Sequence, residues 1–353
     1  MSYMTIDNPE LYFQTKIYTG QSSDLAVTFD GSENMQPDWV WIKNRDSTPS
    51  HMLNDSVRGA GKQLNSDNTS AELDRTYFKS FDSNGFSVEH SVSDYNSNGV
   101  NYVSWNWKAG TSFTNDASAT GIGTIDSAGS VNTNAGFSIC TWTGTGSTNG
   151  TIKHGLNTTP AFIIQRRRDG DSWFTWHQKL STTAKYVLLN TTAGEADGST
   201  SIWTGSPNAN TFGIGNNTAV NESGGNYLAY CFNEVKGYSK FGSYTGNGNA
   251  DGTFVYTGFK PAFVMTKKTS SSTARNWCIL DNKRSSSGAN VVDDRLFPNL
   301  ADAEDSSTSA DFLSNGFKLR DNAGEFNQAV SYIFMAFAES PFVNSKGVPT
   351  NAR

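Results

Sequence analysis

The same ordered set of sequence signals recurs three times along the chain, and this internal repeat limits the fold more than any other feature. Each pass opens with an aromatic residue followed by Thr-Gly, and a proline with an apolar run follows 15 to 17 residues later. Each pass closes 65 to 71 residues after its proline with a run that begins with tyrosine. The recurrence of three anchors in one order predicts three related structural units. The opening tripeptides are Tyr18–Gly20, Trp142–Gly144 and Tyr244–Gly246, the prolines are Pro37, Pro160 and Pro261, and the closing runs are Tyr102–Trp107, Tyr227–Phe232 and Tyr332–Phe337.

The closing runs have the pattern of β-strands with one bulky side. Successive side chains of a strand point to opposite faces, and we expect the large apolar side of each run to face a core. The other side is smaller and more varied, which indicates an outer or sheet-to-sheet face. The proline-led runs are apolar on both sides, so we expect them to lie centrally within a sheet. The bulky sides are Val103, Trp105 and Trp107, then Leu228, Tyr230 and Phe232, then Ile333, Met335 and Phe337.

Turn signals between the apolar runs favour an all-β fold. Phe81–Phe86 and Phe312–Phe317 each carry Asn-Gly between apolar residues, which is a strong hairpin signal. Helical periodicity is almost absent, and only Ala71–Phe78 and Leu296–Glu304 are predicted to form a short helix or turn. The sequence therefore predicts three tandem β-sandwich repeats of the jelly-roll or lectin-like type, each of about 100 residues.

The repeats set the predicted domain boundaries. Residues 1–109 form the first repeat with a short N-terminal arm, 110–120 a linker, 121–236 the second repeat, 237–343 the third repeat, and 344–353 a polar tail. The linker is expected because its residues are mainly Gly, Ser, Thr, Ala and Asn. The join between the second and third repeats is brief, so these two repeats are expected to stay close together.

Composition excludes several classes of function. Only 17% of the 353 residues are charged and the net charge is -6, so the broad basic surface of a nucleic-acid-binding protein is missing. No stretch is long and apolar enough for a membrane-spanning helix, and the first residues lack the features of a secretory signal. We therefore expect a protein made in the cytoplasm, with no nucleic acid partner and no membrane insertion.

Neither a metal site nor a cofactor site is indicated. Cys140, Cys231 and Cys278 are isolated in apolar runs, as expected for small buried hydrophobic residues. The four histidines do not have the spacing of zinc ligands. The loop Asn247–Gly252 resembles a calcium loop but lacks its final acidic residue. No dinucleotide motif, P-loop or serine-nucleophile motif occurs.

Carboxylates provide the main argument for an enzyme, since a glycosidase needs only two of them at a suitable separation. Asp55, Glu72, Asp281 and Glu304 are the candidates. Asp55 and Asp281 occupy matching places in the first and third repeats, and each has an arginine three residues later. This repetition favours structural ion pairs, and we do not expect an enzyme.

The second repeat departs most from the other two and holds the candidate ligand site. Exposed tryptophan stacks on sugar rings and acts as a hot spot at protein interfaces. Burial of the tryptophans in a core is the alternative, and it is the favoured one. The candidate residues are Trp173, Trp176, His177, Trp203 and Arg167.

The combined motifs resemble those of tail-fibre-like virion proteins of tailed bacteriophages, mainly marine ones. This resemblance implies a structural protein of the phage particle that is assembled in the host cytoplasm and exposed on the particle surface. The resemblance assigns no catalytic or binding residues to this chain. The resemblance covers nearly the whole chain and rests on Tyr18–Gly20, Pro37–Arg45, Asp55–Gly59, Ser80–Phe86, Tyr102–Lys108, Gly237–Gly248, Gly258–Val264, Asp311–Leu319 and Tyr332–Glu339.

The function that the resemblance favours is a tail-fibre or receptor-binding protein. Its expected partners are other virion proteins and a host surface glycan or receptor. Two alternatives stay open, namely a capsid decoration or head-fibre protein and a surface polysaccharide depolymerase. A homotrimer is a further expectation, although no heptad seam is present to force it.

Overall fold

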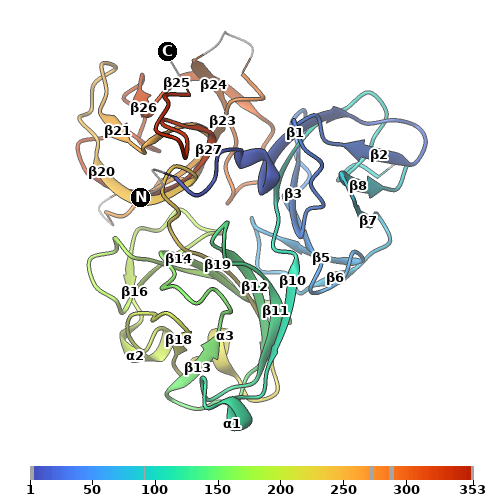
Figure 1. Cartoon of the computed structure of the whole chain (residues 1–353), viewed down its shortest axis with the longest axis vertical. Coiled ribbons are helices and arrows are strands. Elements are labelled where there is room, and N and C mark those ends of the chain that lie inside the picture. Colours follow the sequence, from blue (N-terminus) through green and yellow to red (C-terminus); the bar gives the residue numbers. More distant parts are fainter. Residues whose placement is uncertain (1–3, 91, 271–272, 286–289, 351–353) are drawn as a thin grey trace.

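The computed structural model describes residues 4–90, 92–270, 273–285 and 290–350, and it has the all-β sandwich architecture that the sequence predicts (Figure 1). The strands of these residues form six antiparallel sheets. They are gathered in three lobes around a common centre: the first lobe spans residues 13–107, the second 111–232 and the third 239–341. In Figure 1 the first lobe is mainly blue, the second mainly green, and the third mainly orange and red.

Each lobe contains two sheets, of six and three strands in the first lobe, eight and two in the second, and four and four in the third. In the first lobe these sheets have the orders β1-β9-β3-β4-β5-β6 and β2-β8-β7, in the second β10-β11-β12-β19-β14-β15-β16-β17 and β13-β18, and in the third β20-β27-β22-β23 and β21-β26-β25-β24. The first-lobe strands are β1 Phe13–Thr19, β2 Leu25–Thr28, β3 Trp39–Asn44, β4 Met52–Asp55, β5 Lys62–Asn65, β6 Leu73–Asp74, β7 Phe78–Asp82, β8 Gly85–Val88 and β9 Asn101–Trp107. The second-lobe strands are β10 Thr111–Asn115, β11 Ser127–Asn132, β12 Phe137–Thr143, β13 Gly150–Lys153, β14 Phe162–Arg167, β15 Trp173–His177, β16 Lys185–Leu188, β17 Ala196–Asp197, β18 Thr211–Ile214 and β19 Asn226–Phe232. The third-lobe strands are β20 Ser239–Thr245, β21 Phe254–Tyr256, β22 Phe259–Lys268, β23 Cys278–Asp281, β24 Val291–Arg295, β25 Asp305–Leu313, β26 Gly316–Leu319 and β27 Ser331–Pro341.

One four-strand pairing recurs in one sheet of each lobe, as β1-β9-β3-β4, β12-β19-β14-β15 and β20-β27-β22-β23. The proline-led runs lie in β3, β14 and β22, each between two other strands, so their predicted central position is confirmed. The interpretation as three repeats stays a prediction, and the register of these strands agrees with it. Trp39 pairs with Trp107 and Asp55, Phe162 with Phe232 and His177, and Phe263 with Phe337 and Asp281.

A close backbone approach explains the aromatic-Thr-Gly signal. A Cβ atom on Gly20 would lie 2.1 Å from the carbonyl oxygen of Ser97, and on Gly144 and Gly246 the matching distance would be 2.2 Å. No side chain fits at such a distance. The aromatic residue two positions earlier stacks on the tyrosine of the closing strand, with ring centroids 5.1, 5.5 and 5.2 Å apart in the three lobes. The signal thus specifies a contact between the first strand of the pairing and the loop before the closing strand.

The largest hydrophobic cluster belongs to all three lobes together. It gathers the bulky sides of the closing strands β9, β19 and β27. Trp39 of the first lobe stacks on Tyr230 of the second with ring centroids 4.1 Å apart, and Phe13 of the first lobe stacks on Phe337 of the third at 5.1 Å. The prediction that these sides face a core is confirmed. That core, however, lies between the lobes, and we call it the shared core.

Each lobe has a further core between its own two sheets. The smaller sides of the closing strands line it, for example Ala229 and Cys231 in the second lobe and Phe334 and Ala336 in the third. The sequence predicts that the smaller side of each closing strand is either an outer face or a face between two sheets. In the second and third lobes it lies between the two sheets.

The helices of the described residues are few and short, and none is long and apolar enough to cross a membrane. Residues 110–120, where the sequence predicts a linker, hold a strand and a helix. Strand β10 pairs with β11 along its full length, and Asp116 caps the following helix by accepting a hydrogen bond from Ala119. The helices are η1 Pro9–Leu11, α1 Ala117–Thr120, α2 Ser199–Ile202 and α3 Thr218–Asn221.

Neither segment that the sequence predicts as a short helix or turn forms a helix, and both make contacts between lobes. Ala71–Phe78 and Leu296–Glu304 contain no helix, and the second has a turn at residues 298–299. The backbone N–H of Glu72 donates to the carbonyl of Arg168 over 2.7 Å, and that of Glu304 donates to Arg45 over 2.8 Å. Because these bonds run to a neighbouring lobe, they replace the bonds that a local helix would make. The prediction of a short helix or turn is therefore wrong for Ala71–Phe78, whereas the turn is confirmed in Leu296–Glu304.

The N-terminal arm and the polar tail lie against each other beside the third lobe. The backbone N–H of Ser345 donates to Asp7 over 2.6 Å, and η1 contacts β27. Residues 1–3 of the predicted arm and 351–353 of the predicted tail lie outside the described residues.

Candidate functional site

A buried ion-pair cluster joins the first two lobes and contains two of the carboxylates that the sequence marks as enzyme candidates. Asp55, at the end of β4, binds Arg58 with an Oδ2–Nε distance of 2.6 Å, and both side chains are fully buried. Arg58 also pairs with Glu72 at 3.0 Å. The second lobe contributes Arg168, which lies 2.6 Å from Glu72, and Tyr230, whose hydroxyl donates to Asp55 over 2.8 Å. The predicted structural Asp–Arg pair is confirmed here.

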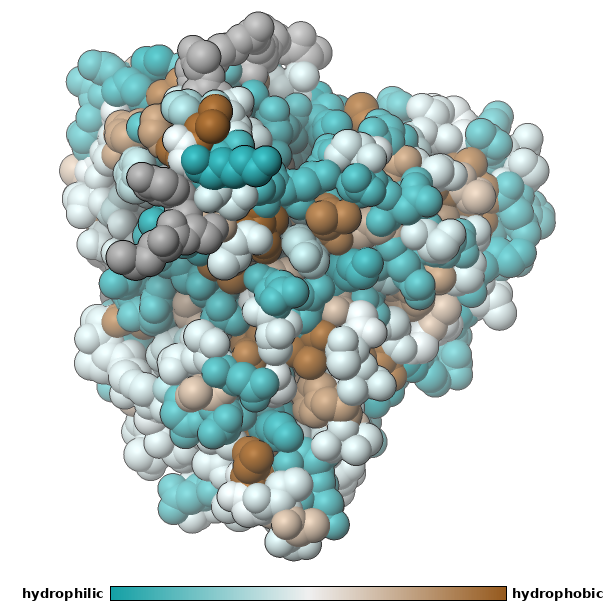
Figure 2. Space-filling model, in the orientation of Figure 1, coloured by the Kyte–Doolittle hydropathy of each residue, from teal (hydrophilic) through white to brown (hydrophobic). Residues whose placement is uncertain are grey.

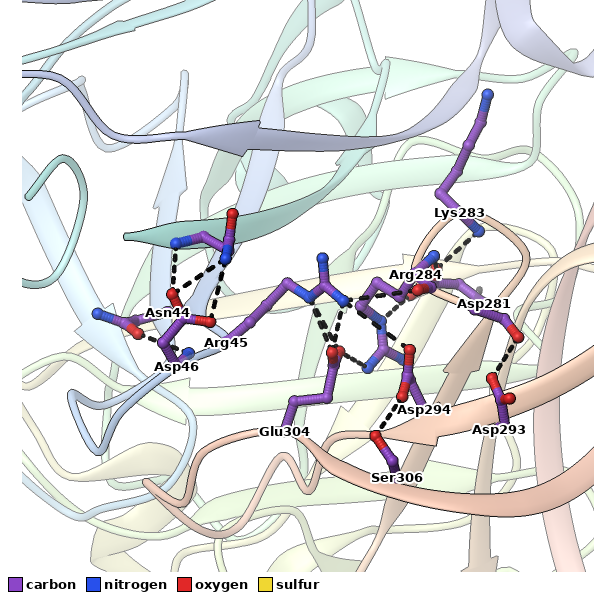
Figure 3. Close-up of polar contacts among 12 residues, drawn as sticks. Asn44, Arg45, Asp46, Asp281, Lys283, Arg284, Asp293, Asp294, Glu304 and Ser306 are labelled. Carbon is purple, nitrogen blue, oxygen red and sulfur yellow. Dashed lines mark hydrogen bonds and ion pairs between the residues drawn. The ribbon is translucent and has the colours of Figure 1, made fainter. Parts of the chain in front are cut away.

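A matching cluster joins the third lobe to the first (Figure 3). Asp281 and Arg284 are fully buried and 2.5 Å apart, and Arg284 pairs with Glu304 at 2.7 Å. The first lobe contributes Arg45, which lies 2.5 Å from Glu304, and Trp105, whose indole N–H donates to Asp281 over 2.9 Å. Figure 3 shows the Glu304 carboxylate between the guanidinium groups of Arg45 and Arg284. Each cluster therefore uses charges from two lobes.

Among the described residues, the junction of the second and third lobes has no such cluster. His177 occupies the strand position that aspartate holds in the other two lobes. Its Nε2 lies 3.2 Å from the carbonyl oxygen of Phe334 in the third lobe, so that nitrogen donates. The backbone N–H of Glu195 donates to the carbonyl of Thr269 over 2.8 Å, which matches the inter-lobe backbone bonds of Glu72 and Glu304. The backbone geometry is kept at this junction although the ion pairs are not.

The electrostatics of the first cluster favour permanent ion pairs over acid–base catalysis. Burial opposes the ionisation of Glu72, but Arg168 and Arg58 outweigh it and lower the pKa of Glu72. Burial lowers the pKa of Arg58, and the charge of Asp55 together with Tyr230 and Glu72 raises it above its ordinary value. Burial also raises the pKa of Tyr230 well above its ordinary value, so its hydroxyl remains a donor. A general acid at neutral pH needs a raised carboxyl pKa, and Glu72 has the opposite shift.

One buried cation stands at the same strand position in each lobe, six residues after the proline: Lys43, Arg166 and Lys267. Arg166 donates to two backbone carbonyls of the first lobe, and Lys267 donates to two of the second. Burial lowers the pKa of Lys43 to about 8, of Arg166 to about 10 and of Lys267 to about 7. Arg166 and Lys267 therefore tie neighbouring lobes together and present no charge to an outside ligand.

The residues of the predicted ligand site do not meet at a surface. Trp173, Trp176, Trp203 and His177 are all buried, with exposures of 5% or less. Trp173 lies in the shared core, and the other two tryptophans lie in the core of the second lobe. Arg167 is partly exposed and pairs with Glu222. The tryptophans thus have the core positions that the sequence favours as the alternative.

Two surface hollows hold side chains that the sequence does not single out. The larger has a volume of about 780 Å³ and lies beside β10, β11 and β12, with polar lining residues such as Asp126, Thr141 and Asn226. The smaller has a volume of about 370 Å³ and lies beside β20 and β21, with Phe254 and Tyr256 in its wall. On the face shown in Figure 2, hydrophobic residues are scattered among polar ones, so an exposed aromatic pair is distinctive.

Comparison with known proteins places the chain in a family. The family described as a domain of unknown function (DUF7483) matches residues 8–341. The chain belongs to the DUF7483 family. The match reaches from before η1 to the end of β27, so it takes in all three lobes and both ion-pair clusters. No curated protein and no solved structure matches the chain.

The reactive side chains of this DUF7483 member are mostly buried. Cys140, Cys231 and Cys278 are free and buried, as predicted. Burial lowers the pKa of His154 to about 4. In the part of the chain that the structure describes, no group of three or more His, Cys, Asp or Glu residues is placed to hold a metal ion. In the loop that resembles a calcium loop, Asp251 pairs with Lys318 at 2.8 Å.

Proposed function

We propose that the chain is a structural protein of a tailed-phage particle, exposed on the particle surface, which acts as a tail-fibre or receptor-binding component. The resemblance of its motifs to tail-fibre-like virion proteins is the sequence argument for this role. The structural observation that supports it best is the shared core, in which Trp39, Tyr230, Phe13 and Phe337 pack across lobe boundaries.

A shared core suits a protein that must persist outside a cell. Local opening of one lobe would expose aromatic surface of the other two and would break the buried ion pairs at the junctions. Regions with many buried apolar contacts open least often, and slow unfolding protects a protein that no chaperone can repair. The three lobes would then form a stiff body that presents its peripheral loops to partners.

The buried carboxylates support a binding role over a depolymerase role. Asp55 and Asp281 are fully buried beside arginines, so neither can reach a polysaccharide without opening a junction. We propose other virion proteins and a host surface glycan or receptor as the partners. The shared core already packs three lobes of one chain against one another. We therefore propose that the core is complete in a single chain and needs no homotrimer.

Localisation on purified particles tests the virion role. Gold-labelled antibodies raised against the full chain, or cryo-electron microscopy of the particle, would show where the protein stands. We expect label on the tail. Label on the capsid lattice would contradict the tail-fibre role and favour a decoration protein, and label-free particles would contradict the virion role itself.

Adsorption competition tests receptor binding separately. Purified full chain added to host cells should slow the adsorption of phage, and an equal amount of heat-denatured chain should not. Adsorption that is unchanged at saturating protein would contradict receptor binding. An enzyme would release reducing ends from host polysaccharide. Release that is abolished by Asp126→Asn in the larger hollow would contradict the proposal that the protein binds glycan without cutting it.

A further inference from the structure

The smaller hollow contains the most exposed aromatic pair of the described residues. Tyr256 is 59% exposed and Phe254 is 42% exposed, whereas Val255 between them is buried. All three lie on β21, which is an edge strand of its sheet. Alternate residues of a strand share a face and lie about 7 Å apart, so the two rings lie on one face of β21, which we call the aromatic platform.

The backbone beneath the rings gives the platform a defined shape. Phe254 lies across the neighbouring strand over Gly316, where an added Cβ would be 3.0 Å from its Cζ. Tyr256 lies over Gly258, where an added Cβ would be 3.5 Å from its hydroxyl. Glycine at position 316 leaves room for the Phe254 ring, and the Tyr256 ring lies at ordinary contact distance from Gly258. The platform is therefore formed before any ligand arrives, which reduces the entropy cost of binding.

A lysine from another lobe completes the hollow. Lys179 follows β15 of the second lobe, is exposed, and has no carboxylate partner in the part of the chain that the structure describes. Its backbone is held in place, because its N–H donates to Nδ1 of His177 over 3.1 Å. The neighbouring Gln178 donates to the carbonyl of Phe241 on β20 over 2.7 Å. The inter-lobe junction thus fixes the backbone of Lys179 beside the hollow, which Lys179 lines together with Phe254 and Tyr256.

The other charged side chain of the hollow leaves its potential positive. Lys240 on β20 also lines the hollow and shares its charge with Glu234 at 3.0 Å. In a chain of net charge -6, this hollow has two lysines and no carboxylate among its described lining residues. It favours a ligand that combines a flat apolar face with a negative charge.

We propose that this hollow binds a carboxylated saccharide, of the uronic-acid class. The C–H face of a sugar ring would pack on Tyr256 and Phe254, whose ring faces carry negative quadrupole density. The sugar carboxylate would pair with Lys179 in a charge-assisted hydrogen bond. The volume of about 370 Å³ lies at the lower end of the range for small-ligand sites, about 300–1,000 Å³. The proposal rests on the receptor-binding part of the proposed function and gives that binding a chemical class.

Calorimetric titration of the full chain with an alginate hexasaccharide tests the proposal. Tyr256→Ala and Lys179→Gln should each weaken the affinity roughly tenfold, which is about 1.4 kcal/mol. Tyr256→Phe keeps the ring and should stay within about threefold of the unmodified chain. Lys236→Gln is the matched control, because Lys236 is exposed and lies outside the hollow. High salt should weaken hexasaccharide binding by the unmodified chain more than binding by the Lys179→Gln variant.

Three results would overturn the proposal. They are no binding of the hexasaccharide by the unmodified chain, equal loss in Lys179→Gln and Lys236→Gln, and equal or tighter binding of neutral cellohexaose or a hexaglutamate peptide. Circular dichroism of each variant excludes unfolding as the cause of any loss. Localisation on the particle is measured independently, so failure of saccharide binding and failure of the virion role are distinguishable.

Discussion

The indole nitrogen of Trp105 donates a hydrogen bond to a carboxylate oxygen of Asp281 over 2.9 Å, although the two residues are 176 positions apart in the chain. Trp105 lies on β9 of the first lobe and Asp281 ends β23 of the third. Tyr230 makes the corresponding bond from the second lobe to Asp55 of the first. An aromatic donor on one lobe thus satisfies a buried aspartate on the next at two of the three junctions.

Replacing Trp105 with Phe should remove this hydrogen bond while keeping an aromatic ring in the shared core. We expect the free energy of unfolding to fall by about 1–3 kcal/mol beyond the packing loss, because a buried carboxylate loses a donor. Urea unfolding measures the change. Trp142→Phe is the matched control, because Trp142 is also buried and its indole nitrogen has no partner within the described residues. Equal losses in the two variants would contradict the assigned role of the bond.

Replacing Arg58 with Met should be more damaging, because Asp55 and Glu72 would lose the guanidinium that they share. Removing one partner of a buried ion pair costs about 3–5 kcal/mol. The exposed pair of Lys62 and Asp74 serves as a control, and Lys62→Gln should cost less than about 1 kcal/mol.

The double variant Asp55→Asn with Arg58→Met sharpens this test. It removes a buried negative charge together with its partner, so it should be more stable than Arg58→Met alone. An Arg58→Met variant that is as stable as Lys62→Gln would show that the cluster does not hold the lobes together.

Much of the sheet that contains the four-strand pairing in each lobe could be predicted from the sequence, because strand alternation reports local burial. The bulky side of Tyr102–Trp107 is buried as expected, and the proline-led runs are central strands. Alternation cannot say what covers a buried face, so it could not distinguish a core inside each lobe from the shared core. The short helix or turn predicted at Ala71–Phe78 failed for a related reason, since the backbone N–H of Glu72 bonds to Arg168 of another lobe.

The site was harder to predict than the fold. The Asp–Arg spacing identified the ion pairs, because a three-residue separation is a local feature. The expected tryptophan site failed to appear at the surface, since aromatic content alone does not separate core from exposed positions. Phe254 and Tyr256 alternate with Val255 in the same way as core strands do, and only the structure shows that their side faces outward.

His177 should make the protein sensitive to mild acid. Burial lowers the pKa of His177 to about 3, whereas the unfolded chain keeps an ordinary value near 6.5. Between these values the unfolded state binds a proton that the folded state does not. The stability contribution of His177 is therefore present above pH 6.5 and is lost as the pH falls toward 3.

His177→Gln should flatten this dependence between pH 6.5 and 5, by up to about 1.4 kcal/mol per pH unit. Chemical unfolding at several pH values measures the slope. His90→Gln is the control, because His90 is exposed beside Asp24. A slope that His177→Gln leaves unchanged would show that His177 does not contribute to the loss of stability in acid.

The most direct test of the shared core is native-state hydrogen exchange on an Ile42→Ala variant. Ile42 lies in the separate core of the first lobe, and replacing it should cost about 2–5 kcal/mol. If the three lobes unfold as one unit, the best-protected amides of β19 and β27 should lose as much protection as those of β9. Loss of protection in the first lobe alone, with β19 and β27 unchanged, would contradict a shared core that couples the three lobes.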